Sequence, residues 1–372
     1  LSYTGNFLNQ LFKRTEPFVR RRDRHTVEER TSAEGEVVVL PDLERLHSLI
    51  GQITADGIEA VAVCFLNSYA NPANERQVTE ILRDHVPFVS SSAEVLNEVR
   101  EFERFSSCVV NTYLMPMMSR YAANLRDRLA AGGLRGPFYT IASNGGLLSE
   151  SQVHETPVRT ILSGPAAGIS AAAYLMSACG RASFITYDMG GTSTDVGLVS
   201  DGDWPLKRET LLDGTLIRIP QLDINTIGAG GGSIARVDAG GVLHVGPQSA
   251  GADPGPACYG KGGTEPTVTD ANLVLGYLDA NNFLGGRQKL DVEASRAAVS
   301  RLAGDLGIDE TIAAAGIHQV VNTNMAEGIR LISVRRGVDP RRFALLSFGG
   351  AASLHVTDLA RQLEIGRVIA PR

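Results

Sequence analysis

The sequence predicts an α/β protein in which mixed sheets are flanked by helices. Residues 58–66 form a predicted apolar strand, and a helix is expected over residues 73–85. Near the end of the chain, a long helix over residues 310–336 precedes a predicted buried strand over residues 343–348. Strands that alternate with helices are typical of a sheet covered by helices.

The other expected elements have the same character. Helices are predicted over residues 41–56, from about residue 99 through 117, and over residues 119–131 and 267–277; a further strand is predicted over residues 138–142. The stretch 246–260 is too rich in Pro and Gly for regular structure but carries few charges. It is therefore expected to be a loop that packs against another part of the protein.

Composition excludes several classes of protein. The chain has 372 residues, enough for two or three domains, with 43% hydrophobic and 20% charged residues. A net charge of -6 argues against a nucleic-acid or anionic-membrane surface, and no apolar run reaches transmembrane length. Four widely spaced cysteines without a Cys-x-x-Cys pair predict reduced thiols. These features predict a cytoplasmic protein.

The stretch 184–199 is predicted to form a β-hairpin that holds phosphate. Its flanks, residues 184–187 and 196–199, have strand composition, and Gly190 and Gly191 let the backbone approach a ligand closely. Three hydroxyl side chains follow the glycines: Thr192, Ser193 and Thr194. Hydroxyls beside exposed backbone N–H groups suit phosphoryl oxygens. The alternative is a tight Gly-Gly turn with ordinary turn hydroxyls.

Two aspartates enclose this turn. Asp188 and Asp195 would repel a phosphate, so their presence indicates a divalent cation or a water between carboxylate and phosphate. Asp223 supplies another carboxylate further along the chain, before a glycine-rich loop. It could reach a metal or a substrate amide, or simply cap a turn.

Two further glycine-rich loops are candidate binding sites. The loop 228–233 includes Gly230, Gly231, Gly232 and Ser233, and apolar neighbours distinguish it from a flexible linker. Gly349, Gly350 and Ala351 follow a strand and precede a helix, an arrangement suited to a nucleotide. His355 lies just beyond; a catalytic role and a structural role are both open, and the structural one is the more common for a lone histidine.

Taken together and in order, these motifs resemble the hydantoinase A/5-oxoprolinase family. The resemblance covers nearly the whole chain from about Arg22. The motifs are Ser143-Asn-Gly-Gly146, Ser163-Gly-Pro-Ala166, Asp188-Met-Gly-Gly-Thr-Ser-Thr-Asp195, Ile227-Gly-Ala-Gly-Gly-Gly-Ser233, residues 246–260 with Thr267-Val-Thr-Asp-Ala-Asn272, and Phe348-Gly-Gly-Ala351. Many relatives have Gly-Gly-Ala-Gly-Pro where this chain has Gly350-Ala351-Ala352-Ser353, so one glycine is lost.

The resemblance implies an actin-like ATPase fold, in which two ribonuclease-H-like domains close on ATP and a divalent metal, Mg²⁺ or Mn²⁺. It implies that residues 1–98 are the end of the family's N-terminal region and that residues 99–372 are its core. In such a fold residues 188–195 would be the second phosphate hairpin and residues 349–351 the adenosine loop. The family's first phosphate hairpin does not occur in this sequence, so we expect a central fragment that is incomplete by itself.

The activity that the resemblance implies is ATP-dependent opening of a cyclic amide such as 5-oxoproline or a hydantoin, through phosphorylation of the amide oxygen. Asp188 and Asp195 are the candidate catalytic residues, and Asp188 and Asp223 the candidate metal ligands. The turn residues 190–194 would hold phosphate, and the loop 228–233 phosphate or the lactam. A subunit or domain resembling hydantoinase B is the expected partner. The alternatives are an ATP-dependent ketone carboxylase and a non-catalytic nucleotide-gated module.

Overall fold

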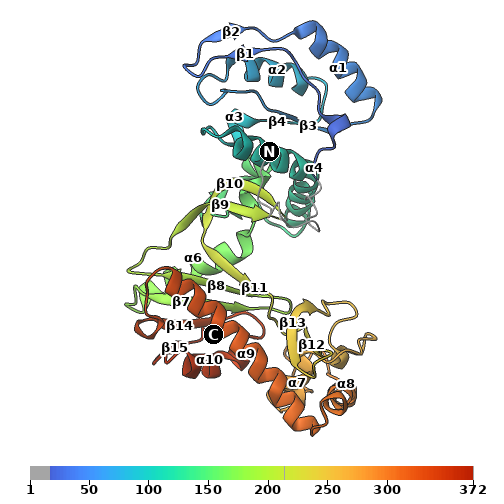
Figure 1. The fold of residues 1–372 in the computed structure, drawn as a ribbon, viewed down its shortest axis with the longest axis vertical. Helices are drawn as coiled ribbons and strands as arrows, with labels where there is room; N and C mark the ends of the chain where they lie inside the picture. Colours follow the sequence, from blue (N-terminus) through green and yellow to red (C-terminus); the bar gives the residue numbers. More distant parts are fainter. Residues whose placement is uncertain (1–16, 213, 372) are drawn as a thin grey trace. The chain divides into compact units, whose positions relative to one another are not determined.

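The computed structural model describes residues 17–212 and 214–371, and the chain divides into two compact units (Figure 1). The first comprises Leu1–Ala167 with Leu206–Leu222, and the second comprises Gly168–Pro205 with Asp223–Arg372. Helix α6 (Ser163–Ala178) spans the point where the chain passes from one unit to the other. The predicted regions 1–98 and 99–372 follow the expected family domains and do not correspond to these two units. The boundary at residue 98 stays a prediction.

The first unit contains a small parallel sheet covered by helices. Strand β3 (Ala60–Val63) pairs in parallel with β4 (Phe88–Ser91), and α2 (Ala73–Arg83) forms the crossover between them. Helix α1 (Leu43–Ala55) begins at Asp42, whose side chain accepts a hydrogen bond from the N–H of Arg45, a typical N-cap. The predicted strand and two predicted helices in this region are thus confirmed.

The remaining elements of this unit are mostly short. They are η1 (Arg21–Asp23), β1 (Arg30–Thr31), β2 (Val37–Val39), α3 (Ser92–Val95), α4 (Glu101–Ala131), β5 (Thr140–Ile141), β6 (Leu147–Leu148), α5 (Glu150–Glu155), η2 (Pro157–Thr160), β9 (Leu206–Leu212) and β10 (Thr215–Leu222). Strands β9 and β10 form an antiparallel hairpin.

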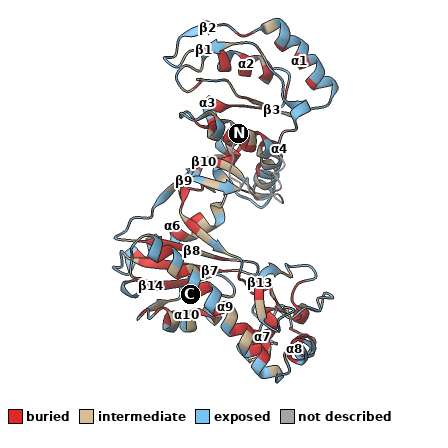
Figure 2. Ribbon diagram, viewed as in Figure 1, coloured by how far each residue is buried: buried red, intermediate tan, exposed pale blue. Residues whose placement is uncertain are grey.

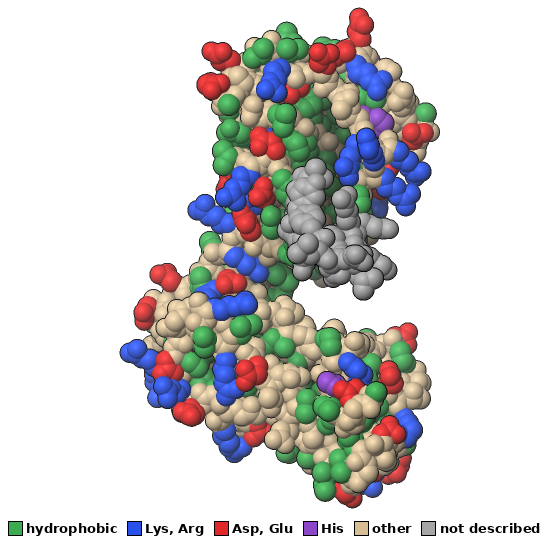
Figure 3. Space-filling view, in the orientation of Figure 1, with side chains coloured by type: hydrophobic (Ala, Val, Ile, Leu, Met, Phe, Trp, Pro, Cys, Tyr) green, Lys and Arg blue, Asp and Glu red, His purple; other side chains and the backbone are tan. Residues whose placement is uncertain are grey.

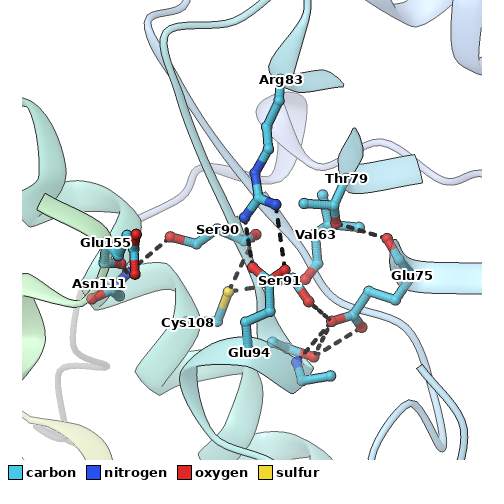
Figure 4. Close-up of polar contacts among 12 residues, drawn as sticks. Val63, Glu75, Thr79, Arg83, Ser90, Ser91, Glu94, Cys108, Asn111 and Glu155 are labelled. Atoms are coloured by element: carbon cyan, nitrogen blue, oxygen red, sulfur yellow. Dashed lines mark hydrogen bonds and ion pairs between the residues drawn. The ribbon is translucent and has the colours of Figure 1, made fainter. Parts of the chain in front are cut away.

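A fully buried carboxylate stabilises the first unit. Glu75 of α2 accepts a hydrogen bond from the hydroxyl of Ser91 at 2.7 Å (Figure 4). It also accepts from the hydroxyl of Ser92 (2.9 Å) and from the N–H groups of Phe65 (2.7 Å) and Ala93 (2.8 Å). A buried charge is tolerated only when its oxygens are hydrogen-bonded, as they are here. Glu75 therefore ties α2 to the end of β4 and the start of α3.

The second unit is built on a five-stranded mixed sheet in the order β11-β8-β7-β14-β15. The strands are β7 (Phe184–Met189), β8 (Thr194–Val199), β11 (Ile224–Ile227), β14 (Ala344–Phe348) and β15 (Val368–Ile369). Strand β8 runs antiparallel to both of its neighbours, β7 and β11, whereas β14 lies parallel to both β7 and β15. The predicted hairpin and the predicted strand near residue 345 are both confirmed.

Helices cover this sheet and complete its core. In β7 five of the six side chains are buried, as expected for a central strand covered on both faces (Figure 2). Met325 and Ile329 of α9 (Glu310–Arg335) belong to the same apolar core as Ile185 and Tyr187 of β7. The core thereby fixes the end of β7, where the predicted phosphate turn begins.

The second unit has further helices and one more hairpin. They are β12 (Ser233–Val237), β13 (Leu243–Ser249), η3 (Ala257–Tyr259), α7 (Val268–Val274), α8 (Val292–Leu306), η4 (Pro340–Arg342), η5 (Ala352–Leu354) and α10 (Val356–Gln362). Strands β12 and β13 pair antiparallel. Charged side chains of both signs are interspersed on the visible face of this unit (Figure 3).

Two sequence-based expectations were wrong. Residues 101–131 form one helix instead of two, because Pro116 removes only a single backbone donor and lies buried within a well-packed stretch. Strand β13 also runs into the stretch expected to lack regular structure. The pairing shifts between Ser233 opposite Ser249 and Ala235 opposite Val245, a bulge that accommodates Pro247. None of the described helices is both long and apolar enough to cross a bilayer.

Candidate active site

The turn between β7 and β8 presents unpaired hydrogen-bond donors. The N–H of Gly190 donates to the carbonyl of Ser193 at 3.0 Å and closes the turn. The N–H groups of Gly191, Thr192 and Ser193, and the hydroxyls of Thr192 and Ser193, have no partner among residues 17–212 and 214–371. Gly191 and Thr192 are exposed. Successive free N–H groups with adjacent hydroxyls form a concave site suited to phosphoryl oxygens.

Thr194 does not belong to this group of donors. Its side chain is buried, and its hydroxyl donates to the carbonyl of Ala229 at 2.5 Å. As the first residue of β8, Thr194 points to the same side as Val196, while Asp195 points to the other side. Thr194 thus supports the following loop, whereas Thr192 and Ser193 are open to a ligand.

The two aspartates of the hairpin lie directly opposite each other. Asp188 of β7 is the cross-strand partner of Asp195 of β8. Burial and, secondarily, the charge of Asp195 raise the pKa of the Asp188 carboxyl. Asp195 accepts a hydrogen bond from the hydroxyl of Thr226 at 2.5 Å. Like charges directly opposite in a sheet are unfavourable, so this pair favours a cation beside it.

These residues fit a magnesium-type site that a nucleotide would complete. Mg²⁺ typically takes one or two protein carboxylates, with waters and substrate phosphates as its other ligands. Asp188 and Asp195 provide two carboxylates next to a turn that suits phosphate. Within the described part of the chain, no group of three His, Cys, Asp or Glu side chains could hold a metal by itself.

The glycine loop after β11 packs directly on the hairpin turn. The N–H groups of Gly231 and Gly232 donate to the carbonyls of Gly190 (3.0 Å) and Gly191 (2.6 Å). A Cβ on Gly230 would lie only 2.6 Å from the carbonyl carbon of Thr192. Only a glycine therefore allows this close approach of two backbones.

The loop's own donors are consequently engaged. The N–H of Gly230 donates to the hydroxyl of Ser233 at 2.8 Å, and the N–H of Ser233 donates to the carbonyl of Gly230 at 3.0 Å. With those of Gly231 and Gly232, the N–H groups of residues 230–233 all have acceptors within the protein. The geometry makes the loop a support for the turn; direct contact with phosphate or substrate stays a prediction.

Sequence reasoning missed two supporting threonines. Thr269 fixes the glycine loop, because its N–H and its hydroxyl both donate to the carbonyl of Gly231, at 2.7 and 2.8 Å. Thr226 holds Asp195, as described above. The capping box of Thr267 and Asp270 marks the start of α7 in the sequence, but no local pattern indicates which loop Thr269 contacts.

The second predicted loop lies beside Asp188. Gly349 follows β14, the parallel neighbour of β7, and has a φ of +93°. A Cβ there would collide with the Oδ1 of Asp188 and with the backbone of Met189. The N–H of Ala351 donates to the carbonyl of Met189 at 3.0 Å. The candidate nucleotide loop and the hairpin thus meet at the carboxyl ends of two parallel strands, a common ligand position in α/β sheets.

The glycine lost relative to many relatives is not needed for an unusual backbone conformation. Among residues 349–355 only Gly349 has a positive φ. Ala352 and Ser353 belong to η5, and Ala352 is fully buried. The loop therefore keeps a regular backbone despite the substitution.

Asp223 lies apart from the other site residues. Thr226 of β11 pairs with Asp195, and Asp223 precedes it by three residues, about 10 Å along an extended chain. Its carboxylate forms an ion pair with Arg336. The structure does not bring Asp223 together with Asp188, and its predicted role as a metal ligand has no geometric support.

His355 is buried in a polar network outside the turn. Its ring stacks on that of His318 with centroids 4.5 Å apart, and its nitrogens contact the amide groups of Asn272 (3.1 Å) and Asn322 (2.8 Å). Burial, with a smaller effect of His318, lowers the pKa of His355 to about 3. A neutral, fully enclosed imidazole fits the structural role that sequence reasoning favoured.

Comparison with known proteins identifies the group to which this chain is related. A family model for hydantoinase/oxoprolinase matches residues 104–372, and one for the hydantoinase/oxoprolinase N-terminal region matches residues 4–86. The chain is 42% identical over 334 residues to caprolactamase subunit alpha of Pseudomonas jessenii, which covers 89% of this chain and 48% of that protein.

Solved structures agree. The crystal structure of the ATP-dependent caprolactamase from Pseudomonas jessenii matches with a TM-score of 0.83 and 39% identity, covering 100% of this chain and 54% of that one. A nucleotide-free structure of acetone carboxylase matches with a TM-score of 0.81 and 28% identity, covering 95% of this chain and 51% of that one. The chain thus spans about half the length of these relatives.

These matches confirm the expected actin-like ATPase fold. The relatives include ATP-dependent hydrolases of cyclic amides and ATP-dependent carboxylases, and the caprolactamase relative is one subunit of a larger enzyme. The match of the core family model to residues 104–372 covers well over half of the sequence. The chain belongs to the hydantoinase/oxoprolinase family.

Proposed function

We propose that this chain is the ATP-using part of an enzyme that hydrolyses a cyclic amide such as 5-oxoproline or a hydantoin. One observation carries the proposal: the N–H groups of Gly191, Thr192 and Ser193, which have no acceptor in the described part of the chain, lie in a turn flanked by the paired carboxylates of Asp188 and Asp195. That combination suits a nucleotide phosphate with a divalent cation. The relation to an ATP-dependent caprolactamase supports the amide as substrate.

Resonance makes an amide a poor electrophile, and ATP removes that obstacle. The amide oxygen attacks the γ-phosphorus of ATP, the bond from this phosphorus to ADP breaks, and an O-phosphorylated amide forms. Water adds to its carbon, and the ring C–N bond breaks as the nitrogen takes a proton. Hydrolysis of the resulting acyl phosphate by a second water releases inorganic phosphate. Such transfers need positioning and charge neutralisation more than covalent help from the protein.

The residues of the site divide these tasks among them. The turn residues 190–193 would hold phosphate oxygens, and Asp188 would bind Mg²⁺ or Mn²⁺ directly or through water. The cation would neutralise charge that develops on the phosphates. Asp195, held by Thr226, would orient the ligands of the cation. Residues 349–351 would lie against the nucleoside.

A second polypeptide is expected to complete the enzyme. The caprolactamase relative is named as one subunit, and this chain covers only 48% of that subunit. We propose a partner subunit or domain of the hydantoinase B type, with no nucleic-acid or membrane partner. A cytoplasmic location also stays a prediction.

The second candidate function is ATP-dependent carboxylation of a ketone. The match to acetone carboxylase favours it. The two activities would share the hairpin and differ in the second substrate, a lactam in one case and a ketone with bicarbonate in the other. A nucleotide-gated module without catalysis is the third outcome that an assay must distinguish.

The test is ADP release by the protein together with a hydantoinase-B-like subunit. The assay compares 5-oxoproline, hydantoin and caprolactam with acetone plus bicarbonate. Stimulation by a lactam, with one ring-opened product per ADP, is expected, and Asp188→Asn should abolish it. The control Asp305→Asn removes an exposed carboxylate of α8 that has no hydrogen-bond or ion-pair partner among residues 17–212 and 214–371. ADP release stimulated only by ketone plus bicarbonate, or nucleotide binding without turnover, would overturn the proposal that the substrate is a cyclic amide.

A further inference from the structure

A groove in the second unit lies behind the glycine loop. It has a volume of about 470 Å³, within the usual range for small-molecule sites. Its walls are formed by Gly228 and Ala229, by strand β13, and by Val320 and Asn324 of α9. Arg236 and His244 also line it. Figure 1 shows the β12–β13 hairpin beside α9. None of the described residues that line the groove is acidic.

Arg236 is exposed, and among the described residues that line the groove it is the one whose charge is not matched. Arg236 of β12 and His244 of β13 are direct cross-strand partners, so their side chains leave the hairpin on the same face. His244 already has a partner, because its Nε2 lies 2.7 Å from the Oδ2 of Asp238. Asp238 is engaged in turn, since its Oδ1 accepts from the N–H groups of Val242 and Gly240.

No hydrogen bond or ion pair is found for the guanidinium of Arg236 within residues 17–212 and 214–371. Most other arginines of the second unit do have such a partner, for example Arg336 with Asp223 and Arg330 with Glu327. A guanidinium offers a planar pair of donors that matches a carboxylate. The groove therefore combines an exposed arginine, unpaired within the described part of the chain, with apolar walls that include Leu243 and Val320.

The groove is continuous with the backbone that supports the phosphate turn. Gly228 is packed so closely that a Cβ there would lie 2.7 Å from the Cβ of Pro247. The carbonyl of Ala229 accepts the hydrogen bond from Thr194, and the next residues, Gly231 and Gly232, donate to the turn. A molecule held in this groove would lie near the place where phosphoryl transfer is proposed.

We propose that this groove is the substrate site of the reaction described above, and that Arg236 selects cyclic amides that carry a carboxylate. The inference rests on the proposed function for its reaction, but not for the binding event. The ring lies against the apolar walls and the carboxylate pairs with Arg236. On this account 5-oxoproline binds, whereas 2-pyrrolidinone, the same ring without the carboxylate, binds weakly.

The test is equilibrium binding of L-5-oxoproline and 2-pyrrolidinone to the protein in the absence of ATP. We expect Arg236→Gln to weaken 5-oxoproline binding by about 10–100-fold, the loss of a charge-assisted hydrogen-bonded pair, and to leave 2-pyrrolidinone unchanged. The control Arg335→Gln removes an exposed arginine near the end of α9 and should change neither. Circular dichroism verifies that each variant is folded.

Three results would overturn the proposal. These are 5-oxoproline binding that survives Arg236→Gln, equal binding of both lactams by the wild type, and loss of ATP affinity in the variant without loss of 5-oxoproline affinity. The ATP assay separates this proposal from the function on which it rests. Binding through Arg236 without stimulated turnover would refute the proposed reaction alone, and turnover with a KM unaffected by Arg236→Gln would refute the groove alone.

Discussion

Replacing Gly230 by alanine tests whether the glycine loop determines the position of the phosphate turn. A Cβ at this position would lie 2.6–2.8 Å from backbone atoms of Thr192 and Gly191, whereas carbon atoms prefer about 3.5–4.0 Å. The turn or the loop must therefore move by about 1 Å. That movement would disrupt the two hydrogen bonds from Gly231 and Gly232 to the turn.

The expected cost follows from these contacts. Two hydrogen bonds contribute about 1 kcal/mol each, and forced overpacking costs about 1–3 kcal/mol, so Gly230→Ala should lose about 3–5 kcal/mol of stability. For a unit of this size that corresponds to a fall in Tm of about 6–20 °C. A displacement of this size at the turn should also lower ATP turnover by about 100-fold.

Thermal unfolding followed by circular dichroism measures the first effect, and ADP release measures the second. The matched control is Gly304→Ala in α8, where a Cβ would meet no atom within 4 Å. This control should be unchanged or more stable by up to about 1 kcal/mol, since alanine favours a helix. A Gly230→Ala protein that melts at the wild-type temperature and turns over ATP normally would refute the reasoning.

Three further predictions concern buried or paired charges. Asp188→Asn should abolish turnover but raise stability at neutral pH by about 0.2–1 kcal/mol, because it removes one of two like charges that lie opposite each other. Since the pKa of Asp188 is raised, the gain in stability over wild type should grow with pH and vanish in acid. A gain that persists in acid would contradict this prediction. The wild type should lose stability as the pH falls from about 6.5 towards 3, because His355 takes up a proton in the unfolded chain but stays neutral when buried. His355→Gln should reduce this loss. Urea titrations across this range measure how the free energy of unfolding changes with pH, and the same pH dependence in the variant would refute the assignment of a neutral, buried His355. Glu75→Ala should cost at least about 3 kcal/mol in urea unfolding because it leaves buried donors unpaired, whereas Glu80→Ala on the exposed side of α2 should cost little; equal costs would refute the role of Glu75.

Local sequence was sufficient to predict the hairpin and its turn. Gly190 and Gly191 between two β-rich stretches require a tight turn, and the paired aspartates indicate a charged ligand. The alternation of side chains along a strand could also have separated Thr194, which shares a face with Val196, from Thr192 and Ser193.

Other features depend on contacts between distant residues and could not be predicted locally. Thr269 supports Gly231, 38 residues away, through a hydrogen bond that only the folded chain shows. Asp223 has the residue type of a metal ligand, but the register of β11 places it away from the turn and beside Arg336. No local sequence pattern distinguishes Arg236, because its proposed role depends on its position in the folded groove, where its guanidinium has no ion-pair partner among the described residues.

The central claim is that nucleotide phosphates bind at the turn between β7 and β8. Its most direct test is a titration of the ¹⁵N-labelled protein with Mg·ATP, monitored by the amide NMR signals of Gly191, Thr192 and Ser193. Their N–H groups have no partner within the described chain, so they should show the largest shifts, and adenosine without phosphate should leave them unchanged. Saturation with nucleotide while these three signals remain in place would contradict the account.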